Sequence, residues 1–179
     1  MKSLLVTISI LAIIGLGIGT MINAVDTVTC TVTPGNYSVS VLPTSDPHGA
    51  MTLSATNRGT LITATNAGSL TAKLNIIGAD ATYSSFTWIL STSAPGTDTY
   101  IHAFSTAANP TSGTATGTDP TAGWVSLDKG STYKTLNASV SSSGTEEFYL
   151  DMRTPTAAGA GTSFGSEYST NVTVAAVAP

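Results

Sequence analysis

The side chains that could carry out chemistry in this sequence are few and far apart. There are two histidines, His48 and His102, and one cysteine, Cys30. His48 stands in a turn-like stretch over 45–49, and His102 stands in YIHAF (100–104), in phase with two aromatic residues. Neither belongs to a catalytic motif such as H-E-x-x-H, and G-x-S-x-G does not occur. We therefore predict a protein that is not an enzyme and has no catalytic residue. We interpret His102 as a core or edge histidine held by a hydrogen bond.

The single cysteine excludes an intramolecular disulfide and a cysteine-pair metal site. Cys30 lies between Val28 and Val32 in TVTCTVT (27–33), on the apolar phase of an alternating segment. This spacing predicts a strand in which Cys30 is buried as a small hydrophobic residue. The alternative is a free thiol that pairs with another chain.

Carboxylates in turns could bind calcium, which takes several oxygen ligands. Five aspartates fall in or near predicted turns, but none is spaced as in a recognised calcium loop. Turn aspartates mostly hydrogen-bond to the nearby backbone. We therefore predict no metal site and no cofactor, with a structural calcium ion as the alternative. The five aspartates are Asp46, Asp80, Asp98, Asp119 and Asp128.

The two tryptophans receive different interpretations. Trp88 lies in FTWIL (86–90) in phase with apolar neighbours, which predicts the core anchor of the domain. Trp124 directly follows a long polar stretch, where it either caps the core or is exposed as a platform for stacking against a sugar ring. Trp124 is therefore the candidate glycan contact.

The N-terminus predicts export. Lys2 is followed by the apolar run LLVTISILAIIGLGI (4–18) and then by small residues, as in a secretory signal peptide. We predict a signal peptide over residues 1–24, with Ala24 as the last residue removed. The alternative is an uncleaved membrane anchor, because 4–22 is 19 residues, just long enough to span a bilayer. Both predict a secreted or cell-surface protein that touches a membrane only through this segment.

The overall composition agrees with export and excludes one class of partner. Charged residues make up 9% of the chain, against about 25% in ordinary globular proteins. The formal net charge is −4 at pH 7. We expect no nucleic-acid binding, because the phosphate backbone attracts a positively charged surface.

Alternation of apolar and polar residues dominates the sequence after residue 26, and no sustained helical period occurs. This pattern predicts strands with one wet face. We predict an all-β, two-sheet antiparallel sandwich, immunoglobulin-like or jelly-roll, preceded by the N-terminal signal or anchor helix. The predicted strands are 27–33, 37–41, 51–55, 60–65, 70–76, 86–90, 100–104, 124–127, 134–140, 147–153 and 168–177.

Two long stretches interrupt this rhythm, at 105–123 and 154–167, and both consist of small and polar residues. Loops of this length are uncommon in compact domains and often carry binding surfaces. The strands on both sides of each loop are needed for one core. We therefore predict one domain over 25–179 with a long loop at 105–123.

Two segments carry a resemblance to a known group of proteins. TATNAGSLTAKLNIIG (63–78) resembles the T-N-x-G hairpin of exported immunoglobulin-like sandwich domains, and 135–155 resembles a strand–turn–strand unit of the same proteins. The chain is similar over 25–179 to small secreted bacterial immunoglobulin-like surface proteins of unassigned function.

Two further likenesses point to the cell envelope. Trp88-Ile89-Leu90 is similar to the W-x-L signature of WxL wall-binding domains, whose second motif would fall where 172–175 reads VTVA. The chain also resembles fibre-forming matrix proteins of the TasA and camelysin type. These polymerise by donating a terminal strand, and by this likeness TVTCTVTP (27–34) would be the donor.

These observations predict a non-enzymatic secreted or cell-surface structural module that can assemble into a surface array or fibre. Its expected partners are copies of itself or other cell-envelope components. The alternative is a glycan- or cell-wall-binding module that uses Trp124 and the long loops.

Overall fold

All the regular secondary structure in the part of the chain that the structure describes consists of β-strands. The computed structural model describes residues 31–113, 120, 123–159 and 166–179. Gly35–Pro179 groups as one compact unit, and residues 31–34 belong to a separate unit, Met1–Pro34. The strands are β1 (Val39–Leu42), β2 (Thr56–Asn66), β3 (Ala72–Ile77), β4 (Ala81–Tyr83), β5 (Phe86–Leu90), β6 (Thr99–Ser105), β7 (Val125–Ser126), β8 (Lys134–Val140), β9 (Thr145–Arg153) and β10 (Thr173–Val177).

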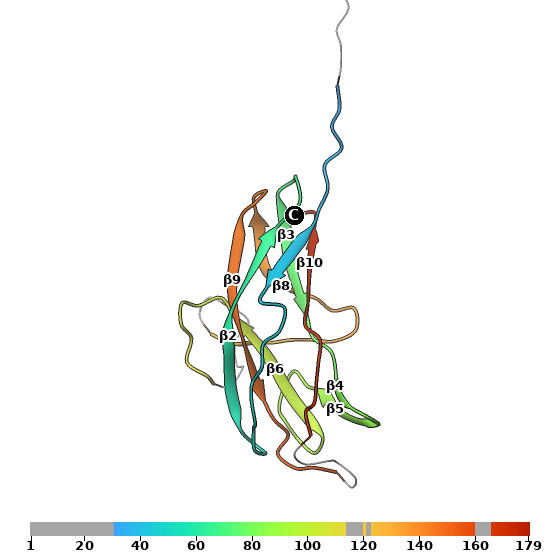
Figure 1. The fold of residues 1–179 in the computed structure, drawn as a ribbon, viewed down its shortest axis with the longest axis vertical. Helices are drawn as coiled ribbons and strands as arrows, with labels where there is room; N and C mark the ends of the chain where they lie inside the picture. Colours follow the sequence, from blue (N-terminus) through green and yellow to red (C-terminus); the bar gives the residue numbers. More distant parts are fainter. Residues whose placement is uncertain (1–30, 114–119, 121–122, 160–165) are drawn as a thin grey trace, which may run out of the picture. The chain divides into compact units, whose positions relative to one another are not determined.

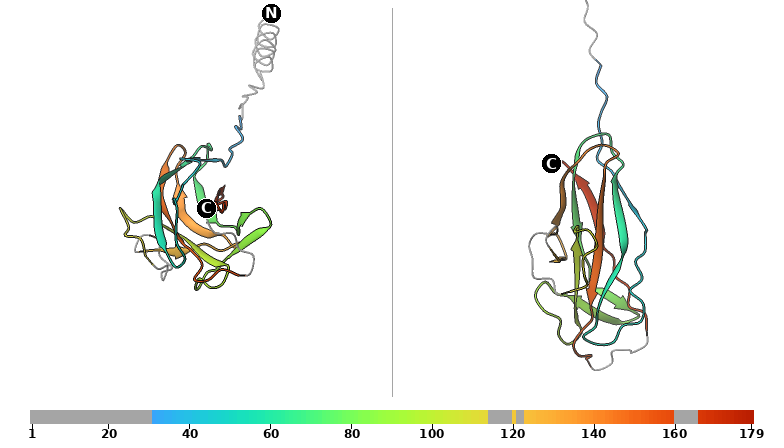
Figure 2. Two further views of the ribbon diagram at one scale, coloured as in Figure 1. Left: turned by 60° about the horizontal axis from the view of Figure 1, so that its bottom comes forward. Right: turned by 90° about the vertical axis from the view of Figure 1, so that its left-hand side faces the viewer.

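The strands form two sheets (Figure 1). The larger sheet has the order β1-β2-β9-β6-β5-β4, with β7 paired to β6, and the smaller sheet has the order β10-β3-β8. Every pairing is antiparallel except that of β5 with β6, which is parallel. Figure 2 shows the same strands from two further directions.

One hydrophobic core is shared by the two sheets. β2, β6 and β9 contribute side chains such as Ile62, Phe104 and Phe148 to it. β3 and β8 contribute Leu74 and Val140 from the smaller sheet. A sheet with one apolar face hides that face by packing it against a second one, and the two layers do so here.

The prediction of an all-β protein is confirmed, and most predicted strands are present. The segments predicted at 60–65, 86–90, 100–104, 134–140 and 147–153 lie within β2, β5, β6, β8 and β9. Those predicted at 37–41, 70–76 and 124–127 overlap β1, β3 and β7 with shifted ends. Alternation identified most of these segments because their strands have one face on the core and one face toward solvent, whereas β6 is buried on both faces.

Two strand predictions were wrong where the structure describes them. Residues 31–33 of the predicted strand 27–33 form no strand, and Val32 is 88% exposed. Residues 51–55 form a turn in which Ser54 has a positive φ of 59° and its N–H binds the Pro155 carbonyl. Alternation alone does not make a strand, because a strand also needs a neighbour for its backbone hydrogen bonds.

Other boundaries moved as well. Of the segment predicted at 168–177, only Thr173–Val177 is a strand, while Ser169 makes an isolated bridge to Thr82. The prediction missed β4, which pairs with β5 as a short hairpin. Leu70 is 40% exposed instead of buried, since the chain is still in a turn at that position.

The T-N-x-G segment is organised around a buried asparagine. The Nδ2 of Asn66 lies 2.8, 2.9 and 3.1 Å from the backbone oxygens of Leu70, Val140 and Ser141, and its Oδ1 accepts the N–H of Gly68 at 3.0 Å. Its backbone also pairs with the turn at 141–144. We call this arrangement the Asn66 junction; it ties two turns to each other although their residues lie about seventy positions apart.

The predicted leader over 1–24 and Cys30 lie outside the described residues. No helix among the residues that the structure describes is long and apolar enough to cross a membrane.

Candidate functional site

Trp124, the candidate glycan contact, is buried. Only 6% of it is exposed, and it packs with Ile101, Ala103 and Tyr149 on the face of the larger sheet that lies away from the main core. Its indole N–H donates to the Thr111 carbonyl at 2.8 Å. Of the two alternatives for Trp124, exposure as a sugar platform is therefore wrong, and the cap is confirmed: Trp124 covers a small second core.

The described part of the long loop at 105–123 lies over this second core. Ser112 donates its hydroxyl to Asp151 at 2.7 Å, and the N–H of Gly113 lies 3.4 Å from the other carboxylate oxygen. Burial raises the pKa of Asp151, although these two hydrogen bonds oppose that shift. Arg58 donates to the Asn109 side chain and lies over the ring of Tyr149. These contacts give this part of the loop a packing role.

Four of the five turn aspartates are placed, and each accepts a hydrogen bond or forms an ion pair with a residue beyond its immediate sequence neighbours. Asp46 accepts from Thr60, Asp80 from Lys129 and the N–H of Leu90, and Asp98 from the N–H of Gly159. Asp128 forms an ion pair with Lys134. Asp119 lies outside the described residues. The sequence did not predict these longer-range bonds, which for Asp46, Asp80 and Asp98 connect separate parts of the chain.

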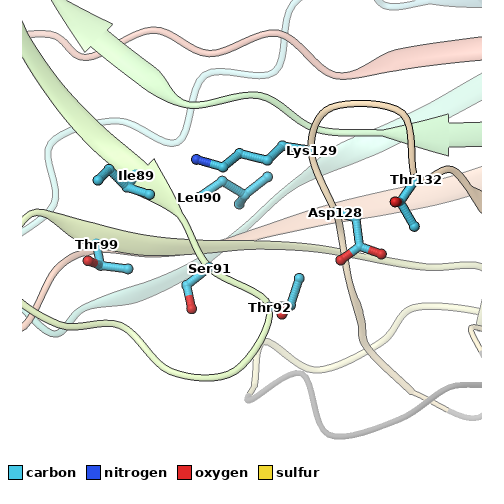
Figure 3. A pocket seen from close by; sticks show the side chains of 8 residues that line it. All are labelled: Ile89, Leu90, Ser91, Thr92, Thr99, Asp128, Lys129 and Thr132. Carbon is cyan, nitrogen blue, oxygen red and sulfur yellow. The ribbon is translucent and has the colours of Figure 1, made fainter.

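An open groove of about 510 Å³ lies beside the end of β5. Figure 3 shows residues 89–92 and Thr99 along one side, and Asp128, Lys129 and Thr132 along the other. Lys129 pairs with Asp80 at 2.7 Å. Burial acts to raise the pKa of Asp80, but the hydrogen bonds from Lys129 and Leu90 outweigh burial and lower it. No aromatic ring lines this groove.

Trp88, predicted as the core anchor, packs against the main core from its margin. Its ring stacks on Tyr168 with centroids 4.0 Å apart and planes at 11°, and Tyr83 lies 5.9 Å from the same tyrosine ring. The stacking fixes the segment before β10 against the β4–β5 hairpin. Trp88 is therefore part of the framework, but at the margin of the core and not as the central anchor that the sequence predicted.

The main core is incompletely covered where β1 and β10 approach each other from opposite sheets. Each of these two edge strands pairs on one side only within the described residues. Five apolar side chains from this region are half-buried and contact the core. We call this set the β1–β10 seam; it consists of Val39, Val41, Val172, Val174 and Ala176.

The two histidines lie together although they are 54 positions apart in the sequence. Their ring centroids are 5.8 Å apart, and the planes meet at 75°. His102 lies on β6, 3% exposed, and none of the four ring nitrogens has a hydrogen-bond partner. The expected hydrogen bond of His102 was therefore wrong. Burial, with a smaller contribution from His48, lowers the pKa of His102 to about 3.

Asp46 completes this cluster, which we call the histidine pair with Asp46. Its Oδ2 lies 3.8 Å from the His48 Nε2 and has no hydrogen-bond partner, while its Oδ1 accepts the N–H of Thr60 at 2.7 Å. The sequence hint was S-D-P-H-G (45–49), where an aspartate and a histidine stand two positions apart. Nothing local indicated that His102 would join them.

The comparisons with known proteins add no relative. Neither protein-family models, nor curated proteins, nor solved structures match this chain.

Proposed function

We propose that this protein is a non-enzymatic structural module, secreted or at the cell surface, that assembles into an array or fibre by strand exchange at the β1–β10 seam. The sandwich is then of the immunoglobulin-like or jelly-roll kind. Its partners are further copies of the chain, and the leader delivers it to the outside of the cell.

The observation that carries this proposal is the half-buried apolar row of the seam. Edge strands with unpaired backbone groups accept an added strand readily. The strand added at β10 would cover Val174 and Ala176 and hydrogen-bond to the free edge. Natural proteins usually block such edges with charged residues, yet no charged residue occurs in either VSVL (39–42) or TVAAV (173–177).

The segment TVTCTVT (27–33) has the pattern that such an edge needs. Val28, Cys30 and Val32 alternate with threonines, so one face is apolar and the other is hydroxylated. Val32 is exposed in the structure, and fully burying one valine contributes about 1.5–3 kcal/mol. A second copy of the chain therefore offers a suitable strand to the seam.

Sedimentation velocity and electron microscopy of the exported protein test this proposal. We expect assemblies that grow with protein concentration. Val32→Asp places a charge on the apolar face of the donated strand and should abolish them. Thr33→Asp is the matched control, because it adds the same charge one position along, on the hydroxylated face, and should retain them.

A competition experiment sharpens the result. A synthetic peptide with the sequence of residues 27–34, with serine at position 30, should cap the free edges and shorten the assemblies, whereas a scrambled peptide should not. A protein that stays monomeric at every concentration contradicts the proposal, and so do variants at positions 32 and 33 that assemble equally well.

A further inference from the structure

Residues 43–50, which follow β1, are held to the rest of the protein mainly by two residues; we call this stretch the 43–50 segment. The side chains of Asp46 and His48 are 7% and 8% exposed, whereas the other six residues are exposed and none of the eight belongs to a strand. The turn that follows is anchored by hydrogen bonds to the residues after β9. Parts of a protein with few buried contacts open locally while the fold stays intact, and this segment is of that kind.

Asp46 holds the segment on a bulge of β2. The register of β2 against β9 shifts between Arg58 and Leu61. At this bulge the Asp46 Oδ1 accepts the N–H and the hydroxyl of Thr60 at 2.7 and 3.1 Å. The carboxylate lies so close to Gly59 that a Cβ on this glycine would collide with it. The segment therefore covers the bulge while it is in place.

His48 holds the same segment on β6. Its carbonyl accepts the side-chain amide of Asn57 at 2.7 Å, and its ring meets that of His102 with centroids 5.8 Å apart and planes at 75°. His102 is 3% exposed, and none of the four ring nitrogens has a hydrogen-bond partner. The contact between the segment and β6 is thus a contact between two imidazoles shielded from water.

A proton acts against this contact. An imidazolium ion needs hydration or hydrogen-bond acceptors, and the closed site gives His102 neither. Burial, with a smaller contribution from His48, lowers the pKa of His102 to about 3. When the segment leaves, the ring reaches water and its pKa returns toward the ordinary value of about 6.5. As the pH falls, a proton therefore binds the open form before it binds the closed form.

Other ionisable groups around the pair come from three elements. Asp46 lies 3.8 Å from the Nε2 of His48, and Tyr100, whose pKa is raised by burial to about 12, is beside the pair on β6. Arg58 on β2 and Asp151 on β9 complete the set. Burial raises the pKa of Asp151, so its protonation favours the closed form and opposes opening.

We propose that the 43–50 segment is an acid-sensitive cover, which opens as His102 binds a proton and exposes the bulge of β2 while the two sheets stay packed. The open form binds one more proton than the closed form. Its equilibrium constant therefore rises by up to about tenfold for each pH unit below 6.5. This proposal does not depend on assembly at the β1–β10 seam.

Hydrogen exchange of the full chain, measured by NMR at several pH values, tests the proposal. The amide of Thr60 reports on opening, because Asp46 accepts it in the closed form. After correction for the pH dependence of exchange in a free peptide, its opening constant should rise roughly 70-fold from pH 6 to pH 4. The amide of Ala64 is the comparison, since this residue lies on the same strand between β1 and β9. It should stay far better protected at both pH values.

Two variants and one measurement on the unaltered chain identify the group responsible. His102→Leu removes the titrating ring and should abolish the rise, whereas Asp151→Asn removes the raised carboxyl group and should retain it. In the unaltered protein the ring-nitrogen signals of His102 should be those of a neutral imidazole at pH 5. A Thr60 opening constant that does not rise overturns the proposal. A rise that persists in His102→Leu overturns it too, as do equal protection of Thr60 and Ala64 and a charged His102 ring in the folded protein at pH 5.

Discussion

Two buried polar regions of this protein, the Asn66 junction and the histidine pair, show opposite solutions to the same problem. Asn66 is fully buried, and its amide nitrogen and oxygen both find backbone partners. His48 and His102 are also buried, but their nitrogens find none. A satisfied buried group is part of the framework, whereas an unsatisfied one costs stability unless a ligand compensates for it. The comparison separates a buried polar residue that stabilises the fold from two that cost it stability.

The largest effect is expected when the satisfied region is broken. Asn66→Ala removes several hydrogen bonds and leaves the carbonyls of Leu70 and Val140 without their donor. We expect the free energy of unfolding to fall by about 3–5 kcal/mol, measured by urea denaturation. The exposed Asn171→Ala is the control and should change it by less than about 0.5 kcal/mol. A loss at position 66 no larger than in the control would remove the junction from the framework.

The opposite sign is expected for the histidine. His102→Leu replaces two unpartnered nitrogens by an apolar side chain of similar size. We expect the free energy of unfolding to rise by about 1–2 kcal/mol in the same urea assay. A loss of stability instead would mean that the imidazole makes compensating interactions in the fold, and the contrast with Asn66 would fail.

The pH dependence of stability gives a second measure of the same contrast. The pKa of His102 is 6.5 in the unfolded chain and about 3 in the fold. As the pH falls, the unfolded state therefore binds the proton first. The contribution of neutral His102 to stability is fully present above pH 6.5 and is lost as the pH falls toward 3.

Between pH 7.5 and 5.5 the protein should lose about 1.4 kcal/mol of stability from this group. His48 lies against His102 within the fold, and Asp46 lies beside His48. Asp151 is on β9, the strand next to β6, and Arg58 is on β2, the strand beyond β9. His102→Leu keeps these other groups and should reduce the slope. An unchanged slope in that variant would show that the loss comes from elsewhere.

The smallest effect is expected at the margin of the Asn66 junction. The exposed Ser142 donates its hydroxyl to the Gly68 carbonyl at 2.8 Å. Since water can replace that donor, Ser142→Ala should lower the free energy of unfolding by about 0.5–1 kcal/mol in urea. An effect as large as that of Asn66→Ala would mean that the margin, and not the buried amide, holds the two turns together.

The sequence located much of the framework but little of the sites. The strand predicted at 134–140 coincides with β8, because alternation depends on neighbouring residues along one strand. The T-N-x-G segment was noticed as a hairpin, but the partners of Asn66 at 140–141 were not foreseeable from it. The sequence left open whether Trp124 caps the core or is exposed as a sugar platform. Its exposure depends on a loop packed over it, and that packing leaves no local pattern.

The sequence by itself determined that this protein is made of strands. Successive side chains of a strand point to opposite faces, so the alternation can be recognised from neighbouring residues alone. Tertiary structure decided which strands became edges, which tryptophan was covered and which histidines met. His48 and His102 belong to different segments that approach only when the sheets pack. Distances between residues far apart in the chain follow from the packing of the whole core, and no short stretch of sequence encodes them.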